Sequence, residues 1–246
     1  MNELLAILGS VTIVSVISFA GAVFIGLREG LMKRLLMVLV AFSSGTLIAS
    51  AFLDLLPEAL NELYPVRAFS FVILGIVVFF AMEKFLYWRH CHEGECPVHM
   101  FAYVNLVGDG VHNFIDGMII AASFILSYDL GFATTLAVIF HEIPQEIGDF
   151  GVLIYGGLAK RKALAYNFIS ALTAVAGSLV TYYLASYVQD VGAFLVPFAA
   201  GGFIYIAATD LMPELHKKYH AKESFIQLVA ILFGIGSMLA LRVMLS

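Results

Sequence analysis

The sequence has few charged residues: Asp, Glu, Lys and Arg together fill 13% of its 246 positions. A soluble domain of this size carries about a quarter, and 61% of the residues here are hydrophobic. This composition excludes an ordinary soluble domain and indicates an all-α membrane protein that crosses the lipid bilayer several times. The apolar runs are continuous rather than alternating, which argues against membrane-spanning strands.

Several recognisable signatures are also missing. The sequence has no Gly-rich run ending in Gly-Lys-Ser or Gly-Lys-Thr and no dinucleotide-binding fingerprint, so we expect no ATP hydrolysis. No hydrophilic stretch is long enough for a separate soluble domain, which predicts one transmembrane domain over residues 1–246 and no nucleic-acid partner. The amino terminus lacks the basic start of a secretory signal, so the first apolar run is expected to remain as a span.

Eight apolar runs of about 20 residues predict eight transmembrane helices joined by short links. We expect the helices at residues 4–27, 35–56, 68–88, 101–127, 132–158, 164–188, 193–211 and 224–245.

The basic residues predict how these spans are oriented. Eleven of the 13 Lys and Arg residues lie in the links after spans one, three, five and seven, and only Arg67 and Arg242 lie on the other side. Because basic links stay in the cytoplasm, we expect a multi-pass protein of the cell (inner) membrane with both termini extracytoplasmic.

Two stretches of the sequence resemble each other. Residues 45–58 and 201–214 share Gly, Ile, Ala, Asp, Leu, Pro and Glu at the same offsets, although their spans run in opposite directions. This pattern predicts an inverted repeat of spans 1–3 and 6–8 around central spans 4 and 5, as in many secondary transporters. The alternative is that Asp-Leu-x-Pro-Glu simply caps two helices.

Polar residues cluster within the two central spans, where ionisable groups are costly unless they are paired or bound. Histidine nitrogen, carboxylate oxygen and amide oxygen are ligands of divalent first-row metals. Spacings of four residues place several of these groups on shared helix faces, and Pro144 is expected to kink span five and free a carbonyl. The candidate metal-binding residues are His112, Asn113, Asp116, His141, Glu142, Gln145 and Glu146.

Further polar residues lie outside this centre. Four aspartates could form acidic paths into and out of the site, although each alone is more often a helix-end residue: Asp54, Asp109, Asp149 and Asp210. The third link, at about residues 89–100, is rich in soft ligands that are expected to bind metal rather than form a disulfide in the cytoplasm; a merely solvated link is the alternative. Its candidate ligands are His90, Cys91, His92, Cys96 and His99.

These motifs resemble the ZIP family of zinc- and iron-regulated-type metal transporters over nearly the whole chain. The resemblance includes the His-rich third link, His-Asn-Phe-Ile-Asp-Gly on span four and His-Glu-Ile-Pro-Gln-Glu-Ile-Gly-Asp-Phe on span five. It implies a transport site at His112, Asp116, His141 and Gln145, and an adjoining second site at Asn113, Asp116, Glu142 and Gln145. Close zinc-selective members have His where this chain has Gln145, whose amide oxygen is a harder and weaker ligand.

The resulting interpretation is a transporter rather than an enzyme. We expect uptake of Zn²⁺ into the cytoplasm, with Fe²⁺, Mn²⁺, Co²⁺ or Cd²⁺ as other substrates and no catalytic cofactor; the resemblance also implies a homodimer. The alternative is an intramembrane zinc metalloprotease, because His141-Glu142-x-x-Gln145 differs by one residue from His-Glu-x-x-His. Gln145 and the Pro within the motif argue against it, and a metal-sensing receptor would need a signalling domain that the sequence lacks.

Overall fold

The computed structural model describes residues 3–21, 29–90, 98–187, 191–216 and 221–245, and among these it contains helices and no strand. The first half comprises α1 (Glu3–Ile17), α3 (Glu29–Ala49), the π-helical segment η1 (Ser50–Leu55), α4 (Leu56–Glu62), α5 (Pro65–His90) and α6 (Val98–Leu126). The second half comprises α7 (Tyr128–Tyr155), α8 (Lys160–Ala171), α9 (Thr173–Leu184), α10 (Val191–Tyr205), the π-helical segment η2 (Ile206–Leu211), α11 (Met212–Leu215) and α12 (Ala221–Leu245).

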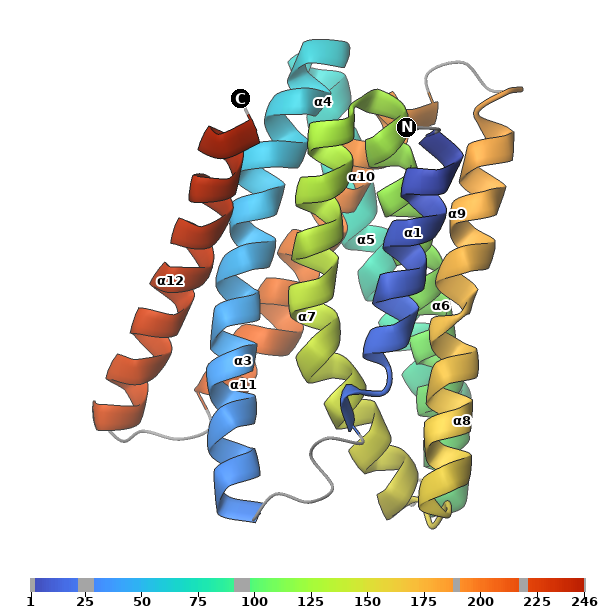
Figure 1. Ribbon diagram of the computed structural model, residues 1–246, viewed down its shortest axis with the longest axis vertical. Coiled ribbons are helices and arrows are strands. Elements are labelled where there is room, and N and C mark those ends of the chain that lie inside the picture. Colours follow the sequence, from blue (N-terminus) through green and yellow to red (C-terminus); the bar gives the residue numbers. More distant parts are fainter. Residues whose placement is uncertain (1–2, 22–28, 91–97, 188–190, 217–220, 246) are drawn as a thin grey trace.

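The helices form one upright bundle in which successive spans alternate in direction, and the N- and C-terminal ends lie at the same end (Figure 1). Six described stretches are long and apolar enough to cross a bilayer: Arg34–Glu62, Pro65–Met82, Asn105–Leu126, Lys160–Leu184, Val191–Leu215 and Ala221–Met244. The shorter apolar α1 and the 28-residue α7 run beside them (Figure 1). The chain is therefore an all-α membrane protein, as its composition predicts.

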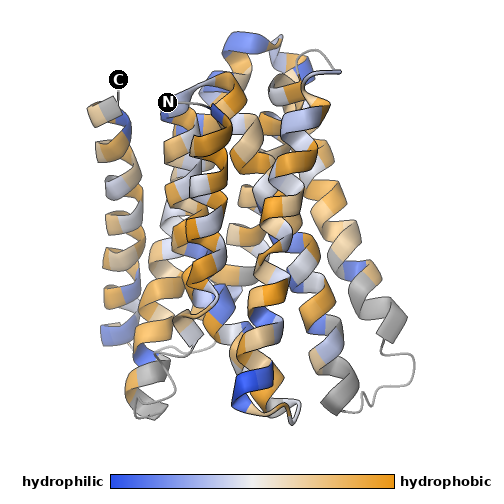
Figure 2. Ribbon diagram, turned by 45° about the vertical axis from the view of Figure 1, so that its right-hand side comes forward, coloured by the Kyte–Doolittle hydropathy of each residue, from blue (hydrophilic) through white to orange (hydrophobic). Residues whose placement is uncertain are grey.

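Many apolar side chains lie on the outside of the bundle, and others form a buried core. Apolar residues colour most of the length of the helices, including their outer faces (Figure 2). Phe225, Leu232, Phe233 and Val243 of α12, for example, are exposed, which a bilayer tolerates and water does not. Inside, one cluster of buried apolar side chains joins α1, α3, α5, α6, α7, α9, α10 and α12, so the bundle has a common core.

The two similar stretches of sequence each contain a π-helical segment. Ser50–Leu55 and Ile206–Leu211 occupy the same positions within residues 45–58 and 201–214. A π turn widens the helix by one residue, and such turns are frequent at functional sites. The shared sequence therefore corresponds to a shared local conformation, while the wider inverted repeat stays a prediction.

Two helix breaks were not predicted from the apolar runs. The first run, expected to be helical over residues 4–27, turns at Ser18 and Phe19, where the hydroxyls of Ser15 and Ser18 bond backbone carbonyls. The sixth run is interrupted at Leu172 between α8 and α9, and Thr173 bonds the carbonyl of Ser170 there. Serine and threonine hydroxyls compete with the helical hydrogen-bond ladder, and hydropathy alone does not register this.

Candidate metal centre

Four buried side chains from α6 and α7 point their ligand atoms at one another. His112, Asp116, His141 and Glu142 each offer one nitrogen or oxygen atom, and these four atoms all lie within 4.8 Å of one another. His141 Nε2 is 3.1 Å from Asp116 Oδ2 and 3.3 Å from His112 Nε2. Glu142 Oε1 lies 3.4 Å from His112 Nε2 and 3.5 Å from His141 Nε2. We call these four residues the central cluster.

The spacing of the central cluster matches the coordination shell of a small divalent ion. Zinc binds nitrogen and oxygen ligands at about 2.0–2.2 Å, so the ligand atoms of a tetrahedral zinc lie roughly 3.3 Å apart. The five measured separations run from 3.1 to 3.5 Å. The two carboxylates would balance the charge of a divalent cation, which removes most of the cost of burying them.

Three of the four carboxylate oxygens of the cluster also lack a hydrogen-bond donor among the described residues. Asp116 Oδ1 and both carboxylate oxygens of Glu142 are buried without a hydrogen-bond partner among the described residues. Buried acceptors are nearly always satisfied in folded proteins. Since these three oxygens accept no hydrogen bond within the described part of the chain, a cation is the partner that their chemistry calls for.

Backbone contacts fix the orientation of His141. Its Nδ1 lies 3.1 Å from the carbonyl oxygen of Ala137, one turn earlier in α7. Because a carbonyl can only accept, Nδ1 carries the proton and Nε2 keeps its lone pair for the centre of the cluster. Phe203 of α10 packs its ring edge-to-face against the imidazole, with centroids 5.8 Å apart.

Pro144 lies inside α7, as the sequence indicates, but the carbonyl that it frees is not left for a metal. A proline cannot donate to the carbonyl four residues earlier, here that of Phe140. In the structure Ser43 Oγ of α3 donates to this carbonyl at 2.5 Å. The proline therefore creates a hydrogen bond between α3 and α7 directly beside His141.

The polar residues next to the cluster bond mainly to one another. Asn113 Nδ2 donates to Asp109 Oδ1 at 2.9 Å, and Gln145 Nε2 approaches the same oxygen at 3.5 Å. One turn farther towards the other end, Asn105 Nδ2 donates to Asp149 Oδ1 at 2.7 Å. The structure thus brings together Asp109 and Asp149 with their amide partners on the side of the cluster away from the termini.

Glu146 lies in a separate contact that sequence analysis missed. Its carboxylate accepts a hydrogen bond from Asn167 of α8, whose amide group also approaches the carbonyl oxygen of Ser18 at 3.4 Å. Both side chains are fully buried. Asn167 is a polar residue near the start of the predicted span 164–188, and that position was the available signal. The contact ties α7 to α8 and to the turn after α1.

Comparison with known proteins identifies the family. The family model described as "ZIP Zinc transporter" matches residues 3–97 and 89–242. The chain belongs to the ZIP zinc transporter family. The members it resembles are transporters and not enzymes, which removes the basis for the metalloprotease alternative.

Three relatives of this ZIP chain illustrate the similarity. Zinc transporter zipt-7.1 of Caenorhabditis briggsae is 31% identical over 275 residues, covering 82% of this chain and 70% of the relative. Zinc transporter zipt-7.2 of Caenorhabditis elegans is 31% identical and covers 82% of this chain and 57% of the relative. Zinc transporter ZIP13 of Pongo abelii is 33% identical, covering 80% and 64%.

The remaining predicted residues of the ZIP chain lie away from the central cluster. Asp54 is buried in η1 near the end that carries the termini, where it contacts Arg242. Asp210 lies in η2 at the other end, and its side chain is not described. In the third link, residues 91–97 are outside the described residues, and only the backbone positions of His90 in α5 and His99 in α6 are known.

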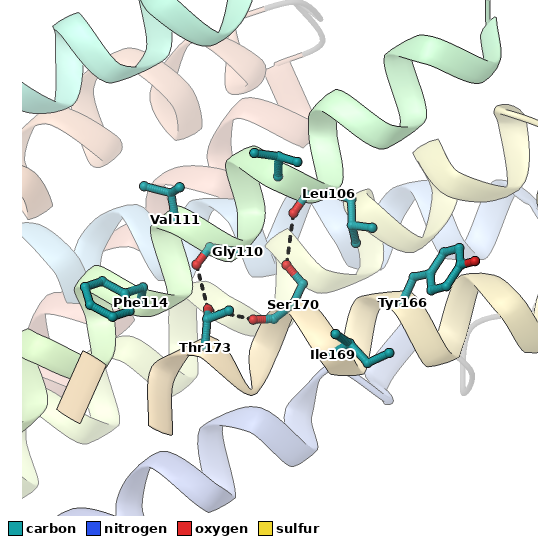
Figure 3. A pocket seen from close by; sticks show the side chains of 9 residues that line it. Leu106, Gly110, Val111, Phe114, Tyr166, Ile169, Ser170 and Thr173 are labelled. Atoms are coloured by element: carbon teal, nitrogen blue, oxygen red, sulfur yellow. Dashed lines mark hydrogen bonds between the residues drawn. The ribbon is translucent and has the colours of Figure 1, made fainter. Parts of the chain in front are cut away.

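A groove of about 420 Å³ lies between α6 and α8–α9 (Figure 3). By helical spacing, its α6 residues lie on the face of that helix opposite to His112 and Asp116. Its walls are mainly apolar, but two hydrogen bonds join them. Ser170 donates to the carbonyl of Leu106 and Thr173 donates to that of Gly110 (Figure 3). These bonds hold α6 against α8–α9. The groove lacks metal ligands and serves here to position the helix that carries His112 and Asp116.

Proposed function

We propose that this ZIP-family chain transports divalent transition-metal ions, chiefly Zn²⁺, across the cell membrane into the cytoplasm without ATP. The observation that supports this most strongly is the central cluster. Two imidazole nitrogens and two carboxylates converge at the spacing of a tetrahedral ion between the middle parts of α6 and α7. The relatives named above are called zinc transporters, and the same donor set suits Fe²⁺, Mn²⁺, Co²⁺ and Cd²⁺ less selectively.

In this proposal the ion exchanges most of its water for His112, Asp116, His141 and Glu142. Glu142 takes the place that the family resemblance assigns to Gln145, so the first site has two carboxylates. The ion then reaches a neighbouring position formed by amide and carboxylate oxygens of Asn113, Gln145 and Asp109. From there its path to the cytoplasm runs past Asp109 and Asp149. Oxygen-rich ligands bind zinc more weakly than imidazole does, which favours release on that side.

The proposal includes the placement of the molecule in the membrane. The end that carries both termini faces outward, and the ends of α5 and α7 and the start of α6 face the cytoplasm, because the basic links lie there. A single transporter domain over residues 1–246 and assembly as a homodimer belong to the same proposal. Chemical cross-linking of the purified protein in lipid nanodiscs tests the dimer.

The deciding experiment is metal uptake by purified protein in liposomes. Zn²⁺, Fe²⁺, Mn²⁺, Co²⁺ and Cd²⁺ are presented outside, and accumulation inside is followed with a metal-sensitive dye or radioisotope. We expect saturable Zn²⁺ accumulation in protein-containing vesicles that does not occur in protein-free vesicles. Equal metal accumulation in the two preparations would exclude transport by this chain.

A further inference from the structure

A small cavity opens at the end of the bundle where both termini lie, away from the central cluster. Its volume is about 180 Å³, and its charged lining comes from η1, α4, α7 and α12. The residues that matter here are Asp54, Glu58, Asp129 and Arg242. Asp129 lies in the first turn of α7, twelve residues before His141, which places the cavity roughly 18 Å from the central cluster along that helix. We call it the outer cavity.

Asp54 is the buried carboxylate of the outer cavity, and only one of its two oxygens has a partner among the described residues. The residue is 4% exposed and lies in the π turn of η1, which packs against α7 and α10. Its Oδ1 is 3.4 Å from Arg242 Nη1, while its Oδ2 has no hydrogen-bond partner among the described residues. A well-formed Arg–carboxylate pair makes two parallel short bonds, so this single long contact is a weak one.

The two members of this pair differ in their freedom to move. The Arg242 side chain is 44% exposed and that of Asp54 is 5% exposed, so the guanidinium can swing out into solvent whereas the carboxylate stays in the bundle. Exposed ion pairs are worth little, and a long flexible side chain loses entropy when it is held. With Glu58 and Asp129, three carboxylates and one guanidinium line the outer cavity, and the excess negative charge favours a second cation.

Three buried hydroxyls that lack a hydrogen-bond partner among the described residues lie between the outer cavity and the central cluster. Ser50 Oγ, Ser123 Oγ and Thr134 Oγ1 are buried without a hydrogen-bond partner in the described part of the chain. They come from η1, α6 and α7; Ser123 follows Asp116 along α6 and Thr134 precedes His141 along α7, in both cases towards the end of the helix that lies nearer the termini. By contrast, Thr135 bonds a carbonyl of its own helix. The free hydroxyls can replace water around a passing ion.

From these observations we propose that the outer cavity is a docking site for the incoming divalent cation. In this proposal the Arg242 guanidinium pairs with Asp54 until the metal displaces it. The metal then binds both oxygens of Asp54 together with Glu58 or Asp129. The ion that docks is the transported one, so this inference rests on the function proposed above. Arg242 thereby keeps the buried carboxylate neutralised when no metal is present.

The proposal is tested by opposite effects of two single substitutions on zinc uptake in liposomes. Asp54→Asn should raise the KM about tenfold, the effect of losing an interaction of about 1.4 kcal/mol, with a much smaller fall in the rate at saturating zinc. Arg242→Gln should lower the KM several-fold, because no cation has to be displaced. Arg242→Lys keeps a cation and should resemble the parent more closely than Arg242→Gln does.

The matched control is Glu62→Gln, an exposed acidic residue one turn beyond Glu58 that does not line the cavity. It should leave the KM unchanged. If the Asp54–Arg242 pair only holds η1 against α12, both single variants should lower thermal stability and shift the KM in the same direction. That result, or an unchanged KM in Asp54→Asn, would overturn the proposal.

A binding measurement separates this inference from the proposed function. In full-length protein with His141→Ala, equilibrium dialysis with Zn²⁺ should detect a bound ion that is lost when Asp54→Asn is added, while ligands in the third link contribute equally to both proteins. Equal zinc binding by the two proteins would refute the docking site. If the parent takes up no metal but this Asp54-dependent binding remains, the transport function fails and the docking site stands.

Discussion

At the scale of single residues, His141 connects the central cluster. Its Nε2 lies within 3.5 Å of ligand atoms from His112, Asp116 and Glu142, and its Nδ1 proton is held by the Ala137 carbonyl. No other member of the cluster is oriented by a backbone contact of this kind among the described residues.

His141→Ala should therefore abolish zinc uptake in liposomes while the protein still inserts and folds. Loss of a residue that only orients a metal ligand costs roughly 10–100-fold, so the loss of a ligand should cost at least that much. The matched control is His216→Ala, an exposed histidine that contacts the Met212 carbonyl outside the cluster. Parent-like uptake by His141→Ala would refute the assignment of the site.

Gln145→His should sharpen the preference for zinc over Mn²⁺ and Fe²⁺. Imidazole nitrogen is a softer ligand than an amide oxygen, and its protonation competes with metal near pH 6–7, so acid should inhibit the variant more than the parent. The measurement is zinc uptake in excess Mn²⁺ or Fe²⁺ at two pH values. An unchanged competition profile would mean that Gln145 does not touch the ion, in keeping with its contact to Asp109.

The sequence named the residues of the central cluster as candidate metal ligands, but it did not predict which of the candidates would lie together. The i, i+4 spacing indicates that His112 and Asp116 share a face, and the structure brings both together with His141. Whether Glu142 or Gln145 completes the set depends on how α7 is rotated against α6, which periodicity does not specify. The Asn167–Glu146 contact needs α7 and α8 to be adjacent, which only the fold determines.

At the scale of elements, the proline of α7 connects the helix to its neighbour. Pro144→Ala should restore a backbone donor for the Phe140 carbonyl and compete with Ser43, straightening the helix between His141 and Gln145. Because a helix-interior proline costs about 3 kcal/mol relative to alanine, we expect equal or higher thermal stability but slower zinc uptake. Ser43→Ala, which removes only the α3 donor, is the comparison. Uptake at the parent rate by Pro144→Ala would show that the proline has no role in transport.

Two glycines allow a paired test of helix packing. A Cβ on Gly117 would collide with the Ala174 backbone of α9, whereas a Cβ on Gly148 would meet nothing within 4 Å. Gly117→Ala should therefore destabilise the protein by about 1–3 kcal/mol, and Gly148→Ala should be neutral or stabilise it by up to about 1 kcal/mol. Thermal unfolding in detergent compares them, and equal melting temperatures would contradict the tight α6–α9 contact.

The elements were predictable to different degrees. Apolar runs of about 20 residues predicted the six described stretches that are long and apolar enough to cross a bilayer, because the bilayer fixes their length. The π turns of η1 and η2 leave no trace in hydropathy, and only the similarity between residues 45–58 and 201–214 marked them. The break at Leu172 arises from side-chain hydroxyls that bond the backbone, an effect decided by local competition rather than by composition.

At the scale of the whole molecule, the third link and the central cluster should act separately. Deleting residues 91–99 should slow or deregulate zinc uptake without ending it, because the link contains none of the residues of the central cluster but is rich in potential metal ligands. Uptake kinetics of the deletion variant measure this, with titration of a peptide of the link as a second measurement. A peptide that binds no metal would reduce the link to a connector.

The glycine contacts between α6 and α9 also limit which parts of the molecule can move relative to each other. Gly117 meets the Ala174 backbone and Gly177 meets that of Phe114, so a slide of α6 along α9 would drive side chains into main chain. These two helices must travel as one piece, and any alternation of access to the cluster has to occur where α6 and α7 face α10 and α3. A small molecule wedged between α3 and α7 would therefore arrest the transporter, whereas one forced between α6 and α9 would unfold it.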